Sequence, residues 1–137
     1  MSEIVVGYDG SDCAKSALRK AAELANDLGD KLVLVFGYAP GGYGGGEVPA
    51  QREAVKELGE RVTQEGAKLA AEAKADCEVE LVAEHPFHAL IDVAEKRDAR
   101  MIVVGSHGEG PLKGAVLGST PYKLVQLSET PVLVVRP

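Results

Sequence analysis

Tryptophan is absent from this 137-residue chain, and phenylalanine occurs only twice. Because 45% of the residues are nevertheless hydrophobic, the sequence predicts an aliphatic core of valine, leucine, isoleucine and alanine. No segment approaches the roughly 18 consecutive apolar residues that a membrane-spanning helix needs, so no membrane association is expected. The length suits one ordinary domain, and we expect a single domain over residues 1–137.

Cysteine is also scarce, since Cys13 and Cys77 are the only two. They form no C-x-x-C pair and have no second pair with which to hold a metal, so we expect small, buried, reduced thiols. The segment Met1-Ser2-Glu3 has neither a basic region nor a long apolar run, and it predicts no signal peptide. These features favour a soluble, cytoplasmic protein.

Basic residues are fewer than acidic ones, 15 against 21, which gives a formal net charge of −6 at pH 7. This balance argues against nucleic-acid binding, because contact with a phosphate backbone depends on clustered lysine and arginine. A small phosphorylated ligand is not excluded, since helix N-termini and loop amides bind phosphate without net positive charge.

Short apolar runs alternate with segments whose apolar residues recur at helical spacing. Strands are expected at residues 4–8, 32–36, 77–83, 101–104 and 132–135, and the third, which alternates polar and apolar residues, is expected nearest a sheet edge. Helices are expected at 14–28, at 49–74, from 86 onward and at 121–128. This order predicts an α/β fold with a parallel sheet covered on both faces. The glycine-rich segment Gly41–Gly46 predicts a flexible loop.

The most informative motif follows the apolar run Met101–Val104. Gly105-Ser106-His107-Gly108 comes first, and after nine intervening residues Gly118-Ser119-Thr120 opens a segment that can be helical. Glycines let backbone N–H groups approach a bulky anion, and a helix N-terminus favours phosphate. The order therefore predicts a phosphate-binding loop and points to a nucleotide-binding protein.

A second polar cluster, Asp9-Gly10-Ser11-Asp12, follows the first expected strand. In open α/β sheets, ligands bind beyond the carboxyl ends of the strands, where the strand order reverses. If the first strand is central and the fourth lies on its other side, Asp9 and Gly105 meet at one crevice. Asp9 would then contact a ligand or cap the following helix, a task for which Ser11 is an equal candidate.

Over essentially its full length the chain resembles the universal stress protein family. The resemblance rests on Ile4-Val5-Val6-Gly7-Tyr8-Asp9-Gly10-Ser11, on Val103-Val104-Gly105-Ser106-His107-Gly108, on Gly118-Ser119 and on Pro131-Val132-Leu133-Val134-Val135. The ATP-binding branch of that family carries the motif G-x2-G-x9-G-[S/T]. In this chain Gly105, Gly108, Gly118 and Ser119 reproduce that motif with the spacing intact.

The resemblance implies an open, Rossmann-like sheet of five parallel strands in the order 3-2-1-4-5, and a homodimer formed through the last strand, Val132–Val135. It also implies ATP, with Mg²⁺ or another divalent cation, bound at the crevice between Asp9 and Gly105. The nucleotide-binding residues that it implies are Gly7, Asp9, Gly37, Val104, Gly105, Ser106, His107, Gly108, Gly118, Ser119 and Thr120.

Three positions depart from the family pattern. Glu84-His85-Pro86 stands where Gly-x-Pro is usual, Arg100 stands where an aspartate is usual, and Pro121 follows the second glycine motif. Proline suits a first helical turn, so the phosphate-binding loop should tolerate Pro121. A carboxylate at Glu84 would either repel phosphate or help to hold a divalent cation.

Histidine and lysine side chains leave further alternatives open. His107 either donates to a phosphate oxygen or is a solvated loop residue, and Lys113 either reaches phosphate or is simply exposed. His85 and His88 form an H-x-x-H pair, but no third ligand is apparent, so we expect no metal site there.

No catalytic motif is recognisable, since the sequence has no G-x-S-x-G elbow and no G-x4-G-K-[S/T] loop. The sequence favours a nucleotide-dependent regulator of the stress response, in which ATP alters the dimer surface for a protein partner and is hydrolysed slowly at most. Two alternatives stay open: a weak nucleotide hydrolase, and a dimeric stress or interaction protein that binds no nucleotide.

Overall fold

The computed structural model describes residues 2–38, 49–107 and 117–137. These residues form alternating strands and helices: β1 (Glu3–Gly7), α1 (Asp12–Leu28), β2 (Lys31–Gly37), α2 (Pro49–Glu72), β3 (Cys77–Val82), α3 (Pro86–Arg97), β4 (Met101–Gly105), α4 (Ser119–Leu127) and β5 (Val132–Val135). The segment Gly41–Gly46 and the residues Gly108 and Lys113 lie outside the described residues.

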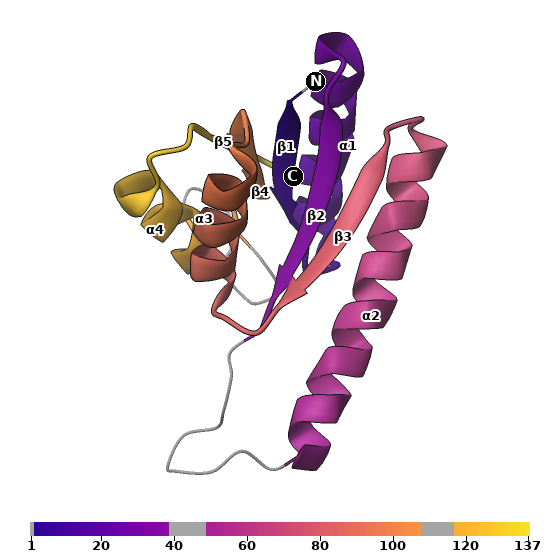
Figure 1. The fold of residues 1–137 in the computed structure, drawn as a ribbon, viewed down its shortest axis with the longest axis vertical. Coiled ribbons are helices and arrows are strands. Elements are labelled where there is room, and N and C mark those ends of the chain that lie inside the picture. The colour runs from indigo at the N-terminus through magenta and orange to yellow at the C-terminus, as the bar shows by residue number, and fades with distance from the viewer. Residues whose placement is uncertain (1, 39–48, 108–116) are drawn as a thin grey trace.

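The five strands form one parallel sheet in the order β3-β2-β1-β4-β5, which confirms the expected fold class and strand order (Figure 1). The central strand β1 pairs with β2 on one side, with Val5 opposite Val33, and with β4 on the other, with Val5 opposite Ile102. The strand order therefore reverses between β1 and β4. The half-polar strand β3 lies at one edge, as its alternation predicts, and β5 lies at the other.

Helices cover both faces of the sheet (Figure 1). Helices α1 and α2 pack on one face, where Leu18 and Ala70 belong to the same buried cluster as Val6. Helices α3 and α4 pack on the other face, where Leu90 and Leu124 share a cluster with Val5. Neighbouring residues of a strand point to opposite faces, which is why Val5 and Val6 belong to different clusters. The core is aliphatic, as predicted, and no helix in the described ranges is long and apolar enough to cross a membrane.

Two glycines inside α2 allow this helix to lie close to the sheet. A Cβ atom at Gly66 would come within 2.8 Å of Leu34 Cδ2, and one at Gly59 would come within 2.8 Å of Leu81 Cδ2. Any larger residue would push α2 away from β2 and β3. Close packing therefore offsets the roughly 1 kcal/mol by which each glycine weakens a helix interior.

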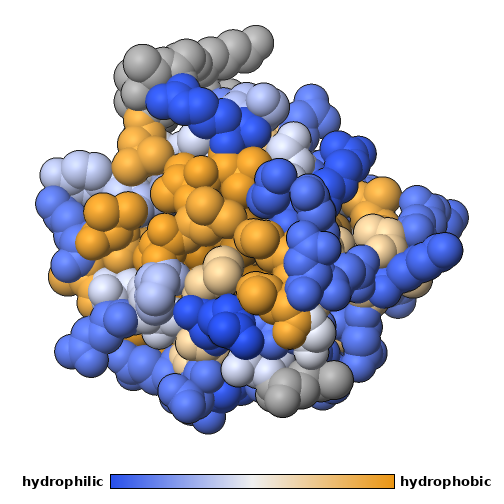
Figure 2. Space-filling view, turned by 90° about the horizontal axis from the view of Figure 1, so that it is seen from above, coloured by the Kyte–Doolittle hydropathy of each residue, from blue (hydrophilic) through white to orange (hydrophobic). Residues whose placement is uncertain are grey.

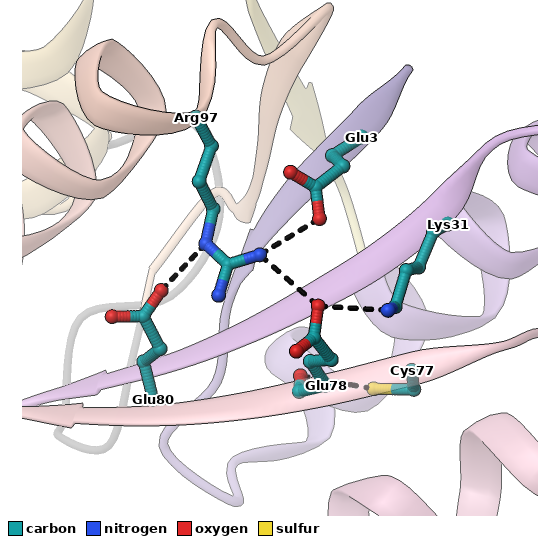
Figure 3. Close-up of polar contacts among 6 residues, drawn as sticks. All are labelled: Glu3, Lys31, Cys77, Glu78, Glu80 and Arg97. Atoms are coloured by element: carbon teal, nitrogen blue, oxygen red, sulfur yellow. Dashed lines mark hydrogen bonds and ion pairs between the residues drawn. The ribbon is translucent and has the colours of Figure 1, made fainter. Parts of the chain in front are cut away.

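Arg97, at the end of α3, binds three carboxylates on the strands beside it (Figure 3). Its Nε atom donates to Glu80 at 2.6 Å, and its Nη1 atom donates to Glu3 at 2.7 Å and to Glu78 at 3.2 Å. Lys31 of β2 also reaches Glu78, at 2.8 Å. These contacts fasten α3 to β1 and β3 on the side of the sheet where the strands begin.

Arg100, directly before β4, pairs with Asp30. Its Nε and Nη2 atoms donate to the two carboxylate oxygens at 2.5 and 3.2 Å, and the N–H of Ser2 donates to the same carboxylate at 3.1 Å. The Asp30 side chain is only 1% exposed. Asp30 thus joins the segments that precede β1, β2 and β4, and the hydrogen bond from Arg100 lowers the pKa of its carboxyl group.

We expect the stability of the fold to depend on the charge of Asp30. Because its pKa is lower in the folded than in the unfolded chain, ionised Asp30 stabilises the fold above the ordinary carboxyl range, and this stabilisation is lost as the pH falls through the folded-state pKa. Asp30→Asn should lower the free energy of unfolding at pH 7 by about 1 kcal/mol and by much less near pH 3. Urea unfolding across pH measures this difference, with Asp27→Asn on the exposed end of α1 as control; a deficit independent of pH would contradict the account.

Candidate functional site

A cavity of about 360 Å³ opens at the carboxyl edge of the sheet, around the ends of β1, β2 and β4. Its volume lies in the range of small-molecule sites. Most of the residues expected from the sequence line it, namely Gly7, Asp9, Gly37, Val104, Gly105, His107, Gly118, Ser119 and Thr120. Ser106 is buried and does not line the cavity, and Gly108 lies outside the described residues.

One part of the cavity wall is apolar. Val35 and Phe36 come from β2, and Pro86 and Leu90 come from α3. Helix α3 approaches this closely because Gly37 has no side chain: a Cβ atom there would lie 2.8 Å from the Cα atom of Pro86. No local pattern in the sequence indicates this wall, since Pro86 and Leu90 look like an ordinary helix start and an ordinary core leucine. Such a wall suits the face of a planar ring.

The first turn of α4 forms the opposite, polar part. Gly118 is its N-cap residue, and the Gly118 N–H already donates to the carbonyl oxygen of Ser106 at 2.7 Å. The N–H groups of Ser119 and Thr120 precede the first hydrogen bond of the helix and have no acceptor within it, whereas Pro121 has no N–H. The helix therefore offers two amides and two hydroxyls at the positive end of its dipole. It begins at Ser119, two residues before the predicted start, because Pro121 sits inside the first turn.

The question of which residue caps α1 is answered by the hydrogen bonds. Ser11 is the cap, since its Oγ atom accepts from the N–H of Ala14 at 3.2 Å. Asp9 Oδ1 accepts from the N–H of Ser11 at 2.9 Å, which holds the exposed Asp9 carboxylate against the start of α1. Among the described residues only Oδ1 of Asp9 is engaged, so Oδ2 is left for a hydroxyl donor on a ligand.

Gly105 has a packing role that the sequence did not reveal. A Cβ atom there would lie 2.8 Å from Cys13 Sγ and 2.9 Å from the carbonyl carbon of Cys13, so β4 can end directly on the first turn of α1. Cys13 is buried, as predicted, but Cys77 is only partly buried. Desolvation raises the pKa of the Cys77 thiol, which keeps it in the neutral form.

The other histidines and Glu84 do not line the cavity. A hydrogen bond with Asp92, together with partial burial and the like charge of that residue, raises the pKa of Glu84, whose carboxyl group therefore faces α3. His85 is the N-cap residue of α3, and His88 stacks on Phe87 with 4.1 Å between ring centroids. Within the part of the chain that the structure describes, no three His, Cys, Asp or Glu side chains are grouped to hold a metal ion.

The fold and the position of the cavity define a doubly wound α/β protein with a crevice where the strand order reverses. The sequence profile of the universal stress protein family matches residues 1–136, and the chain belongs to this family. It is 35% identical over 136 residues to a universal stress protein of Thermus aquaticus, covering 97% of each chain. It is 30% identical over 150 residues to the universal stress protein YxiE of Bacillus subtilis, covering 98% of this chain and 99% of the relative.

Solved structures of universal stress proteins have the same fold. One from Archaeoglobus fulgidus superposes with a TM-score of 0.83 at 25% identity, covering 98% of both chains. The A. fulgidus protein in complex with dAMP gives a TM-score of 0.76 at 25% identity, again covering 98% of both chains. A universal stress protein in complex with cAMP gives 0.79 at 28% identity, covering 98% of this chain and 96% of that one.

We expect Gly105→Ala to destabilise the protein although alanine is small. The added methyl group would overlap the sulfur and the carbonyl group of Cys13, and neither can move without shifting α1. Overpacking of this kind costs about 1–3 kcal/mol, which urea unfolding can measure. Most of the loss should persist in a Cys13→Ala background, because the backbone overlap remains; an unchanged unfolding free energy would show that β4 does not pack on α1 in this way.

Proposed function

We propose that this protein binds an adenine nucleotide in the cavity and acts as a nucleotide-dependent regulator. The observation that carries the proposal is the convergence, on one cavity of about 360 Å³, of an apolar wall, the exposed Asp9 carboxylate and the two first-turn amides of α4. A planar base, a ribose and a phosphate need these three surfaces in this order. The relatives with bound dAMP and cAMP, at 25% and 28% identity, support an adenine nucleotide as the ligand class.

In this proposal each surface has one task. The base lies against Val35 and Leu90 near the Gly37 backbone, and Asp9 Oδ2 accepts from a ribose hydroxyl. The phosphate accepts from the N–H groups of Ser119 and Thr120, where the helix dipole favours an anion. With ATP, Mg²⁺ or another divalent cation would be held by phosphate oxygens and water.

Slow hydrolysis is the most that we propose in the way of catalysis. Phosphoryl transfer needs strong neutralisation of the developing charge and a positioned nucleophile. Among the described lining residues no lysine or arginine is present, and Asp9 is the sole carboxylate. The lining side chains therefore suit a regulator better than an efficient hydrolase. We further propose that residues 1–137 form a single domain and that the protein acts in the cytoplasm.

We also propose that β5 pairs with the β5 strand of a second copy. The Pro131 carbonyl accepts from Ile102 N–H at 2.8 Å and the Val135 carbonyl accepts from Ser106 N–H at 2.9 Å, so alternate residues of β5 bond to β4. The backbone groups of Val132 and Val134 therefore point to the open edge.

Beside the open edge of β5, α4 exposes Tyr122, Val125 and Leu127, and apolar side chains gather on this side of the molecule (Figure 2). Pairing would cover a strand edge that is otherwise prone to aggregate. It would also place α4, whose first turn binds the nucleotide in this proposal, next to the dimer surface that we propose a protein partner binds.

The binding proposal is tested by removing a single amide. Ser119 is the first residue of α4, where proline is well tolerated, so Ser119→Pro removes one phosphate donor with little cost to the helix. Titration calorimetry should show micromolar binding of AMP and ATP to the wild type and a roughly 10- to 100-fold weaker affinity for Ser119→Pro. Ser119→Ala, which keeps the amide, should bind nearly as well as the wild type.

Two outcomes of this titration would count against the proposal. Equal affinities for Ser119→Pro and Ser119→Ala would mean that the amide does not hold the phosphate. No binding of AMP or ATP to the wild type, with or without Mg²⁺, would leave the family's fold without a nucleotide function in this chain.

The dimer proposal is tested at Val134, whose backbone N–H points away from β4. Val134→Pro should leave the β4–β5 ladder intact and abolish pairing across the open edge, because proline has no N–H to donate. Analytical ultracentrifugation should give a dimer for the wild type and for Val134→Ala, and a monomer for Val134→Pro. A dimeric Val134→Pro variant, or a monomeric wild type, would contradict pairing through β5.

A further inference from the structure

Ser106 lies at the centre of a hydrogen-bond network behind the cavity. The residue is only 4% exposed. Its N–H donates to the Val135 carbonyl at 2.9 Å and to Cys13 Sγ at 3.1 Å, and its carbonyl accepts from Gly118 N–H at 2.7 Å. The backbone N–H and carbonyl of Ser106 are thus both engaged within the protein, and its hydroxyl is the group that contacts a side chain of the cavity lining.

The hydroxyl of Ser106 contacts the one histidine that lines the cavity. Ser106 Oγ lies 3.3 Å from Nδ1 of His107 and 3.5 Å from Cys13 Sγ. The Cys13 thiol can donate to the Val135 carbonyl, also at 3.5 Å, so it does not need the hydroxyl as an acceptor. The Ser106 hydroxyl can therefore donate to Nδ1, and a neutral imidazole that accepts at Nδ1 carries its proton on Nε2.

We propose that Ser106 is a positioning residue that holds His107 as the Nε2–H tautomer, so that His107 donates to the nucleotide's phosphate and makes the cavity prefer phosphorylated nucleosides over free ones. This inference rests on the proposed nucleotide binding and deepens it. The family resemblance predicts that Ser106 contacts the nucleotide, whereas in this proposal Ser106 acts on the nucleotide only through His107. His107 is then a donor to the phosphate and not a solvated loop residue.

The arrangement brings donors to the phosphate from two directions. The amides of Ser119 and Thr120 approach from α4, and the His107 imidazole approaches from the end of β4. The hydrogen bond between Gly118 N–H and the Ser106 carbonyl holds these two segments together. Because adenosine has the base and ribose of AMP but no phosphate, only AMP would use the His107 donor.

The test compares AMP with adenosine as probes. Ser106→Ala should weaken AMP binding about 3- to 10-fold, because one neutral hydrogen bond sets the tautomer, and should leave adenosine binding unchanged. His107→Gln places an amide nitrogen near the position of Nε2 and should keep most of the preference for AMP. His107→Asn places its amide nitrogen near Nδ1 and should lose that preference.

A double mutant separates positioning from a merely structural role. Glutamine has no tautomer to set, so adding Ser106→Ala to His107→Gln should cost nothing further in AMP affinity. Equal losses for AMP and adenosine in Ser106→Ala, or the same loss in the His107→Gln background, would overturn the proposal.

The tautomer itself is measurable without ligand. Nitrogen-15 NMR of the imidazole should show the Nε2–H form of His107 in the wild type and a mixture of tautomers in Ser106→Ala; an Nδ1–H form in the wild type would overturn the proposal. A wild type that binds neither AMP nor adenosine removes the proposed function, and this inference with it. A wild type that prefers AMP but is insensitive to Ser106→Ala removes this inference alone.

Discussion

The site depends on one constraint, the parallel pairing of β1 and β4 with Val5 opposite Ile102. Because the two strands end side by side, the residues that follow them enclose a single space at the point where the strand order reverses. Gly105 brings this end of β4 onto the first turn of α1, since it has no side chain to meet Cys13. The hydrogen bond between Gly118 and Ser106 then fixes the start of α4 over the same space.

Stability and binding are divided between the two ends of the sheet. Where the strands begin, Arg97 binds three carboxylates, one of which also pairs with Lys31 (Figure 3). Arg100 pairs with the buried Asp30 there, so the charged side chains at this end have partners within the protein. Where the strands end, the Asp9 carboxylate is exposed and the first amides of α4 have no acceptor in the helix. The arginine at position 100 fits this division, because its partner Asp30 lies at the structural end and not near the cavity.

Periodicity was sufficient to predict the strands, the helices and the edge position of β3, because it is a local signal. The strand order and most of the cavity lining were predicted from the resemblance to the universal stress protein family, whose motifs surround the ends of β1 and β4. The sequence could not predict the wall formed by Pro86 and Leu90, since that wall depends on how closely α3 approaches Gly37. From the sequence, Gly105 was interpreted only as a glycine that binds an anion. The structure shows that its close contact with Cys13 would by itself be a sufficient reason for glycine at this position. Ser106 was expected to touch the ligand, and its burial depends on bonds to β5 and α1 that no local pattern encodes.

The most direct test of the central claim is a crystal structure of the protein grown with AMP. The account expects the phosphate within hydrogen-bonding distance of the Ser119 and Thr120 amides, the ribose beside Asp9, and the adenine ring against Leu90 and Val35. A phosphate bound away from the first turn of α4, or a nucleotide outside the cavity between β1 and β4, would contradict it.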